Sequence, residues 1–290
     1  MILWLASYPK SGNTWLRTIL HQIIVKKKND FDNKWLSNIH RLVDTYPETH
    51  HFKNLNSSFI TKECFQNKKK IIKNWNNSQK KINLTPGLHF LKTHSMLCSI
   101  DIDNQKFNFT NKNNTLGAIY IVRDPRNIIT SLRNHMFLKS HKEALNIMID
   151  TNMWGGVRMG EIPHLLSSWD RNVNSWMLFP KNFILFKYED LLDDTKNQIK
   201  RLIKYLQKFI KIELSEENIN QIIKDTSFEN LRNLEEEGFF LENSINYKNN
   251  KKAKFFHLGP QNDYIKFLNK EIQYKIEEKF ESTMKKLEYL

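Results

Sequence analysis

An octapeptide near the start of the chain carries residue types that bind phosphate. The run Tyr8 to Trp15 (YPKSGNTW) combines a lysine, a serine, a threonine and a glycine. It follows an apolar run, 2–7, that predicts a buried strand, and a helix is predicted from Thr14 to about Lys26. Backbone N–H groups at a helix N-terminus, together with a lysine charge, favour a bound anion. The pattern is not a Walker A loop, because the lysine precedes the glycine, and an ordinary strand–helix turn is the alternative interpretation.

A second group of residues that could bind phosphate follows the apolar run 117–122. Arg123 comes directly after this predicted strand, and Ser131 lies within a helix predicted to begin at Pro125. A guanidinium can hold two phosphate oxygens at once, and a hydroxyl adds a further donor. Taken alone, this turn would more often be a structural ion pair and a helix start.

A Lys-Thr-His tripeptide ends another predicted strand, 88–92. His94 therefore stands at the carboxyl end of a strand, close to Lys92. An imidazole, with an unperturbed pKa of about 6.5, can accept a proton near neutral pH. This position makes His94 a stronger candidate for a proton-accepting site residue than His21, His40, His50 or His51.

Two later segments supply aromatic and polar groups. Tyr188 ends a predicted strand, 183–188, and Glu189 and Asp190 follow it. These two acidic residues could form a catalytic pair, or they could order the loop and start a helix. Further on, Thr226-Ser227-Phe228 is, in isolation, a helix N-cap followed by a core phenylalanine.

The elements that must position these residues define the fold class. Short buried strands alternate with helical patterns, including 195–208 and about 265–287. This alternation predicts an α/β fold, with a central parallel sheet flanked by helices and with ligands bound beyond the carboxyl ends of the strands. No repeat or linker interrupts residues 1–290, so a single domain is expected. The Asn-rich stretches 104–115 and 243–252 are expected to be exposed loops or lids.

Composition excludes several function classes. The net charge of +14 comes from 36 Lys and 9 Arg against 31 acidic residues, which is typical of a lysine-rich solvated surface, and no nucleic-acid partner is expected. Two cysteines, and no paired His/Cys or acidic spacing, predict neither a disulfide framework nor a metal site. No run approaches the ~20 apolar residues that span a membrane. These features predict a cytoplasmic protein without a membrane span, and they are compatible with a homodimer.

In their order and approximate spacing, the segments from residue 2 to about 264 resemble the PAPS-dependent sulfotransferases of the cytosolic type and their bacterial relatives. YPKSGNTW is similar to the family's loop for the 5′-phosphosulfate, with Asn13 in place of the usual threonine. The resemblance implies a P-loop-like nucleotide-binding fold. It implies that the phosphosulfate is bound by Lys10, Ser11, Gly12, Asn13, Thr14 and Trp15.

The resemblance also implies roles for the other segments. Arg123 and Ser131 would hold the 3′-phosphate, Tyr188 would lie near the base, and Thr226 and Phe228 would hold and stack the adenine. For catalysis, it implies four residues. These are His94 as base, Lys10 at the leaving oxygen, Lys92 at the sulfuryl oxygens, and Ser131 as a partner that holds Lys10 until the acceptor arrives.

Three segments depart from the family's pattern or extend it. Its usual Arg-Lys-Gly near the C-terminus corresponds here to His257, Leu258 and Gly259. Both cations are lost, and Lys251, Lys252 or Lys254 could supply the charge instead. The run 168–176 is similar to a family helix whose usual histidine is Asn172 here, with Trp169 and Trp176 expected in the core. An acceptor-binding lid is expected over 136–163, where Gly160 is one of the glycines that would allow motion.

The activity implied by the resemblance is transfer of a sulfuryl group from PAPS to an acceptor hydroxyl or amine. The products would be PAP and a sulfated small molecule or glycan, and no metal is implied. One alternative is a P-loop kinase-like phosphotransferase, which would need ATP and Mg²⁺. Another is a non-catalytic binder of anionic glycans or nucleic acid, for which His94 would be dispensable.

Overall fold

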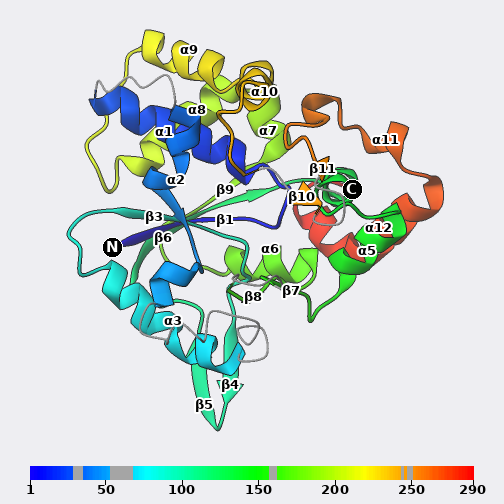
Figure 1. The fold of residues 1–290 in the computed structure, drawn as a ribbon, viewed down its shortest axis with the longest axis horizontal. Helices are drawn as coiled ribbons and strands as arrows, with labels where there is room; N and C mark the ends of the chain where they lie inside the picture. Colours follow the sequence, from blue (N-terminus) through cyan, green and yellow to red (C-terminus); the bar gives the residue numbers. More distant parts are fainter. Residues whose placement is uncertain (29–34, 53–67, 157–161, 243–244, 247–250) are drawn as a thin grey trace. The chain divides into compact units, whose positions relative to one another are not determined.

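The computed structural model describes residues 1–290 except 29–34, 53–67, 157–161, 243–244 and 247–250 (Figure 1). The chain divides into two compact units. The first comprises Met1–Tyr8, Val43–Tyr120 and Ile149–Leu185. The second comprises Pro9–Leu42, Ile121–Met148 and Phe186–Leu290.

A five-stranded sheet has the strand order β2-β3-β1-β6-β9. Its strands are β1 (Ile2–Ala6), β2 (Val43–Thr45), β3 (His89–Thr93), β6 (Thr115–Val122) and β9 (Phe183–Lys187). β1 pairs in parallel with β3 and β6, and β2 pairs in parallel with β3. Every side chain of β1 is buried, as expected of a strand covered on both faces. The predicted α/β class, with a central parallel sheet flanked by helices, is confirmed.

Aromatic side chains form the core of the first unit. Trp4 of β1 contacts Tyr46, Phe109 and Trp176, with ring centroids 5.4, 5.3 and 6.3 Å away. Phe109 in turn contacts Trp75 of α3 (Lys68–Ile82), and Trp176 belongs to α6 (Trp169–Met177). Both helices therefore lie on the face of the sheet to which Trp4 points (Figure 1). The prediction that Trp169 and Trp176 are core residues is confirmed, since both are fully buried.

The stretch 104–115 is not simply the exposed loop expected from its asparagines. Residues 105–108 form β5 (Gln105–Asn108), which pairs antiparallel with β4 (Ser99–Ile102). Thr110 and Thr115 are buried and their hydroxyl oxygens lie 2.8 Å apart. These two hydroxyl groups form a hydrogen bond inside the fold. Part of this polar stretch is therefore a buried hydrogen-bond cluster and not an exposed loop. The first unit also contains η2 (Thr49–Phe52), β7 (Trp154–Gly155) and β8 (His164–Leu165).

The second unit is mainly helical. Its first half contains α1 (Asn13–Lys28), η1 (Trp35–Asn38), α2 (Ile39–Leu42) and α4 (Pro125–His135), and α5 (His141–Ile149) ends at its boundary. After β9 come α7 (Tyr188–Asp193), α8 (Thr195–Leu206), α9 (Glu216–Asp225) and α10 (Phe228–Glu236). α9 packs against α1, α8 and α10. The predicted helix after β1 begins one residue earlier than expected, and α8 ends two residues earlier.

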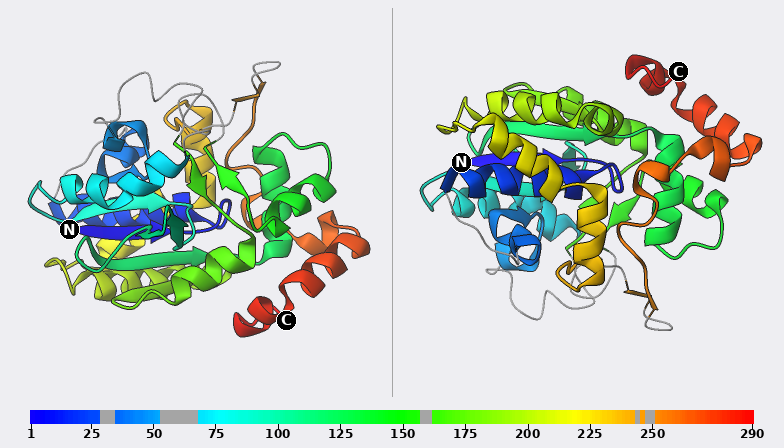
Figure 2. Two further views of the ribbon diagram at one scale, coloured as in Figure 1. Left: turned by 90° about the horizontal axis from the view of Figure 1, so that it is seen from below. Right: turned by 90° about the horizontal axis from the view of Figure 1, so that it is seen from above.

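The C-terminal segment differs from the single helix predicted over about 265–287. It forms η4 (Gly259–Gln261), α11 (Tyr264–Phe267) and α12 (Lys270–Lys286), drawn in succession from orange to red in Figure 2. Asn269 starts α12 because its side chain accepts a hydrogen bond from the Ile272 N–H, which makes it an N-cap. α11 and α12 both pack against α4.

The expected lids lie partly outside the described residues. Gly160 falls in the undescribed range 157–161, and residues 243–244 and 247–250 of the stretch 243–252 are also undescribed. Within the latter, β10 (Ile245–Asn246) pairs antiparallel with β11 (Lys251–Lys252). None of the described helices is long and apolar enough to cross a lipid bilayer.

Candidate functional site

The turn after β1 has a backbone conformation with two positive φ angles. Lys10 and Gly12 have φ values of 65° and 100°, in the region that disfavours L side chains. A Cβ added to Gly12 would lie 2.6 Å from the Tyr188 ring and 3.2 Å from Ile121. Glycine is therefore required both by the backbone conformation and by the close approach of Tyr188.

The same turn leads directly into the N-terminus of α1. Asn13 and Thr14 are the first two residues of this 16-residue helix, and both are buried. Ser11 is fully buried, and its Oγ has no hydrogen-bond partner among the described residues. A buried hydroxyl beside the first N–H groups of a helix, which have no acceptor within the helix itself, is a donor set suited to a phosphate or sulfate.

Lys10 lies against an aromatic cluster of the second unit. Its Nζ is 3.7 Å from the centroid of the Phe255 ring, a cation–π distance. Phe255 packs on Phe256 and Phe240, with ring centroids 5.2 and 4.8 Å away. The half-buried lysine is thus held close to the turn that carries it.

Arg123 follows β6 directly and is 6% exposed. Its guanidinium carbon lies 4.1 Å above the Tyr188 ring, and its Nε has no hydrogen-bond partner among the described residues. The next residue, Asp124, is the N-cap of α4, which also carries the half-buried Ser131. The predicted Arg-Asp-Pro helix start is confirmed.

Tyr188 is the point at which several predicted residues of the second unit meet. One contact is to Gly12 and another is to Arg123, as described above. Its ring also packs edge-on against Trp15, with centroids 5.5 Å apart. The Trp15 Nε1 donates a hydrogen bond of 2.9 Å to the Thr226 carbonyl oxygen. The structure therefore joins the β1 turn, the end of β6, the start of α7 and the α9–α10 connection.

The Thr-Ser-Phe segment has capping roles as well. The Thr226 hydroxyl donates to the Ile222 carbonyl at the end of α9, and Ser227 is the N-cap of α10. Phe228 is half-buried and lies against Gly259, where an added Cβ would come 2.2 Å from the ring. Gly259 is thus a close-packing glycine with a positive φ of 53°.

The segment that replaces the family's Arg-Lys-Gly has neither arginine nor lysine at its first two positions, His257 and Leu258. His257 is exposed and Leu258 is half-buried. Among the alternative lysines, Lys254 pairs with Glu236 at 2.9 Å and Lys252 is exposed. A few residues on, Asn262 donates a 2.7 Å hydrogen bond to the Asn127 carbonyl, which ties this segment to α4.

His94 lies in the first unit, at the end of β3. Its Nδ1 is 2.9 Å from the Ser7 carbonyl oxygen and 3.2 Å from the Ser7 Oγ. A carbonyl oxygen can only accept, so Nδ1 carries a proton, and in the neutral imidazole the lone pair then lies on Nε2. This is the tautomer that a general base needs.

Asn172 holds the backbone that carries His94. Its amide nitrogen donates to the carbonyl oxygens of His94 and Leu166 at 3.0 and 2.9 Å. Its amide oxygen accepts from the Tyr120 hydroxyl at 2.8 Å, and that hydroxyl accepts from the Tyr8 N–H at 3.1 Å. Asn172 is fully buried, so the sequence departure at this position is a structural anchor, which the sequence alone did not reveal.

Lys92 is half-buried in β3, where the structure adds a residue that the sequence did not predict. Burial, together with a smaller contribution from the positive charge of Lys92, lowers the pKa of His164 to about 4. His164 donates from Nδ1 to the Ile162 carbonyl at 3.3 Å. A neutral imidazole therefore lies within the electrostatic reach of Lys92.

One possible metal-ligand group occurs among the described residues: Asp44, His50 and His51. Both imidazole Nε2 atoms lie against the Asp44 Oδ2, at 2.7 and 3.0 Å. The His51 Nδ1 accepts from the Glu48 N–H at 3.2 Å, so its Nε2 carries the proton. A protonated nitrogen is a hydrogen-bond donor, and this cluster is satisfied without a metal ion.

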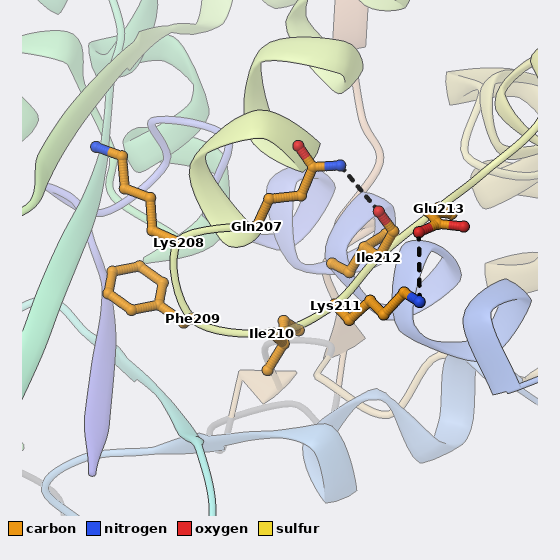
Figure 3. A pocket seen from close by; sticks show the side chains of 7 residues that line it. All are labelled: Gln207, Lys208, Phe209, Ile210, Lys211, Ile212 and Glu213. Carbon is orange, nitrogen blue, oxygen red and sulfur yellow. Dashed lines mark hydrogen bonds and ion pairs between the residues drawn. The ribbon is translucent and has the colours of Figure 1, made fainter.

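A surface pocket on the second unit is formed by one continuous segment, Gln207–Glu213 (Figure 3). The Gln207 side chain donates to the Ile212 carbonyl at 2.9 Å, and Lys211 lies 3.6 Å from Glu213. No residue predicted to bind the nucleotide lines it.

The sequence is similar to that of proteins of known family. The family described as the sulfotransferase domain matches residues 2–288. Flavonol 4′-sulfotransferase from Flaveria chlorifolia is 30% identical over 80% of this chain, and the match spans 64% of that protein. Cytosolic sulfotransferase 10 from Arabidopsis thaliana is 22% identical over 97% of this chain and 77% of its own length.

Solved structures show the same fold. A mouse sulfotransferase complexed with PAP has a TM-score of 0.58 at 17% identity, covering 97% of this chain and 83% of that one. Retinol dehydratase complexed with androsterone and PAP has a TM-score of 0.62 at 18% identity, covering 98% and 80%. Because the family match covers nearly the whole of this chain, the chain belongs to the sulfotransferase domain family.

Proposed function

We propose that this protein transfers the sulfuryl group of PAPS to a hydroxyl or amine of a small-molecule acceptor and releases PAP. The observation that carries the proposal is the environment of Tyr188. The Gly12 turn approaches one part of its ring, and the Arg123 guanidinium lies 4.1 Å above it. An aromatic ring in contact with two anion-binding groups suits a nucleotide with an anion at each end.

The residues present fit such a ligand. The buried Ser11 Oγ and Arg123 Nε have no hydrogen-bond partners among the described residues, and each would gain one from a phosphate or sulfate oxygen. Gly12 directly precedes the N-terminus of α1, where backbone N–H groups favour a bound anion. We assign the 5′-phosphosulfate to Lys10 and the turn that follows it, and the 3′-phosphate to Arg123 and Ser131.

In the reaction, His94 removes the acceptor's proton through Nε2. The acceptor oxygen or nitrogen forms a bond to sulfur, the bond from sulfur to the bridging phosphate oxygen breaks, and the proton remains on His94. Lys10 stabilises the negative charge that develops on the leaving oxygen, and Lys92 stabilises the sulfuryl oxygens. Ser7 and Asn172 hold His94 in place through the hydrogen bonds described above.

The acceptor class is suggested by the relatives. Their names include flavonol, amine and luciferin sulfotransferases, which act on small molecules. We extend that class to this chain, and we further propose one domain over 1–290, because a single family match covers residues 2–288. The relatives named as cytosolic support a cytoplasmic location.

Isothermal titration with PAP, AMP and ATP tests the nucleotide assignment directly. We expect PAP to bind at least ten times more tightly than AMP, with no requirement for Mg²⁺. Turnover of PAPS with a panel of phenols, alcohols and amines, in the presence of a metal chelator, then tests the chemistry. Binding of ATP with Mg²⁺ in preference to PAP would overturn the proposal in favour of a phosphotransferase.

A further inference from the structure

Tyr289 lies just after α12 and is tied to the helix end. Its N–H donates to the Met284 carbonyl at 2.9 Å. Its hydroxyl donates to the Glu189 Oε2, also at 2.9 Å. A residue one hundred positions further along the chain therefore reaches the segment that follows β9.

Glu189 uses its other oxygen to hold the strand end that carries Arg123. The Glu189 Oε1 accepts a 3.0 Å hydrogen bond from the Asp124 N–H, which belongs to the peptide unit that joins Asp124 to Arg123. Both carboxylate oxygens of Glu189 are thus engaged, one by this peptide and one by Tyr289. The side chain is held in one orientation as a result.

A second connection runs through Arg126. Its guanidinium donates to the Tyr289 carbonyl at 2.8 Å, and to the Asp124 carboxylate through Nε at 3.0 Å and a terminal nitrogen at 2.6 Å. Tyr289 therefore contacts the Arg123–Asp124 turn by two routes. The route through Arg126 uses the backbone of Tyr289 and does not depend on its hydroxyl.

Glu189 and Arg123 are also close enough to interact electrostatically. Burial raises the pKa of Glu189, and the positive charge of Arg123 acts in the opposite direction and lowers it. A carboxylate released from Tyr289 could turn towards the guanidinium and form an ion pair. Such a pair would occupy the group that we assign to the 3′-phosphate.

We propose that Tyr289 is a positioning residue that sets selectivity for a 3′-phosphorylated nucleotide. Its hydroxyl keeps Glu189 engaged with the Asp124 peptide, and this leaves the Arg123 guanidinium available to a phosphate. The inference rests on the proposed function, because it concerns the same nucleotide site. It adds a determinant of selectivity that no nucleotide-binding motif of the sequence contains.

The test compares Tyr289→Phe with Tyr274→Phe by calorimetric titration of PAP and AMP. Tyr289→Phe removes one hydroxyl and keeps the ring beside Lys187, whose Nζ lies 4.8 Å from the ring centroid. Tyr274 is the matched control, since it lies on α12 and is 64% exposed. We expect Tyr289→Phe to weaken PAP binding about tenfold, as for loss of one hydrogen bond to a charged group, with AMP affinity within twofold of wild type. Tyr274→Phe should change neither.

The double variant Tyr289→Phe with Glu189→Gln separates this role from a merely structural one. A glutamine keeps an oxygen for the Asp124 N–H but has no charge to pair with Arg123, so PAP affinity should recover to within about threefold of wild type. Equal losses for PAP and AMP, or no recovery, would overturn the inference. If Tyr289→Phe does not fold, Glu189→Gln alone decides: it should bind PAP at least as tightly as wild type, and a selective loss of PAP affinity refutes the inference. Failure of the wild-type protein to prefer PAP over AMP would instead refute the proposed function.

Discussion

Replacement of Gly12 by alanine should separate the effect of backbone strain from the effect of displacing Tyr188. Gly12 has a φ of 100°, and an added Cβ would lie 2.6 Å from the Tyr188 ring. Gly238 is a matched control, with a φ of 86° and nothing within 4 Å of an added Cβ. Both substitutions impose a left-handed backbone on alanine, but only Gly12→Ala forces the ring to move.

The magnitudes follow from these two contributions. The left-handed backbone alone costs about 1–2 kcal/mol for an L residue, so Gly238→Ala should lower the free energy of unfolding by that amount. Overpacking against a buried side chain adds about 1–3 kcal/mol for Gly12→Ala. Because Arg123 lies on the same ring, displacement of Tyr188 should also weaken PAP binding about tenfold or more. Gly238→Ala should leave PAP affinity unchanged.

Urea unfolding and calorimetric titration of PAP on the two variants provide the assay. The difference between the variants, and not the loss in either one, measures the contact with Tyr188. If Gly12→Ala matched Gly238→Ala in both stability and PAP affinity, the argument for a shared aromatic contact would be refuted.

Three further predictions concern the base, the 3′-phosphate and the response to pH. His94→Ala should lower kcat by about 10²–10⁴ with PAP affinity retained, measured by steady-state turnover and titration; full turnover would exclude His94 as the base. Arg123→Ala should weaken PAP but not AMP, and equal effects on the two nucleotides would remove the 3′-phosphate assignment. His164, with its pKa lowered by burial to about 4, stays neutral in the folded protein while the unfolded chain takes up a proton below pH ~6.5. Stability should therefore fall as the pH falls, by ~2 kcal/mol between pH 7.5 and 5 from this group. Urea unfolding of His164→Gln at pH 7.5 and 5 should show a loss smaller by that amount, and an identical loss would contradict the assignment.

Much of the sheet could be predicted because its strands are continuous apolar runs. β1 and β6 are buried along nearly their whole length, and such runs stand out in a sequence. β2 was missed because its three residues, Val43–Thr45, are too short for any periodic signal. α3 begins with three lysines, which hide its amphipathic character in the sequence, although its other face buries Ile71, Ile72 and Trp75.

The candidate site was predictable in its local segments but not in the contacts that join them. A turn such as YPKSGNTW has a recognisable order of residue types, and so does a strand followed by arginine. In contrast, the partners of these segments are distant in sequence. Asn172 supports His94 from 78 positions away, and Tyr289 supports Glu189 from 100 positions away. Long-range hydrogen bonds of this kind leave no periodicity or spacing in a single sequence.

The position of Tyr188 between the Gly12 turn and Arg123 limits how the protein can be re-engineered. A substitution of Tyr188 that is meant to change anion binding at the Gly12 turn would also change it at Arg123, because both groups contact the same ring. Substitutions on the two sides should be non-additive in a double-mutant cycle. A variant adapted to a donor without a 3′-phosphate would therefore need compensating changes in both segments together.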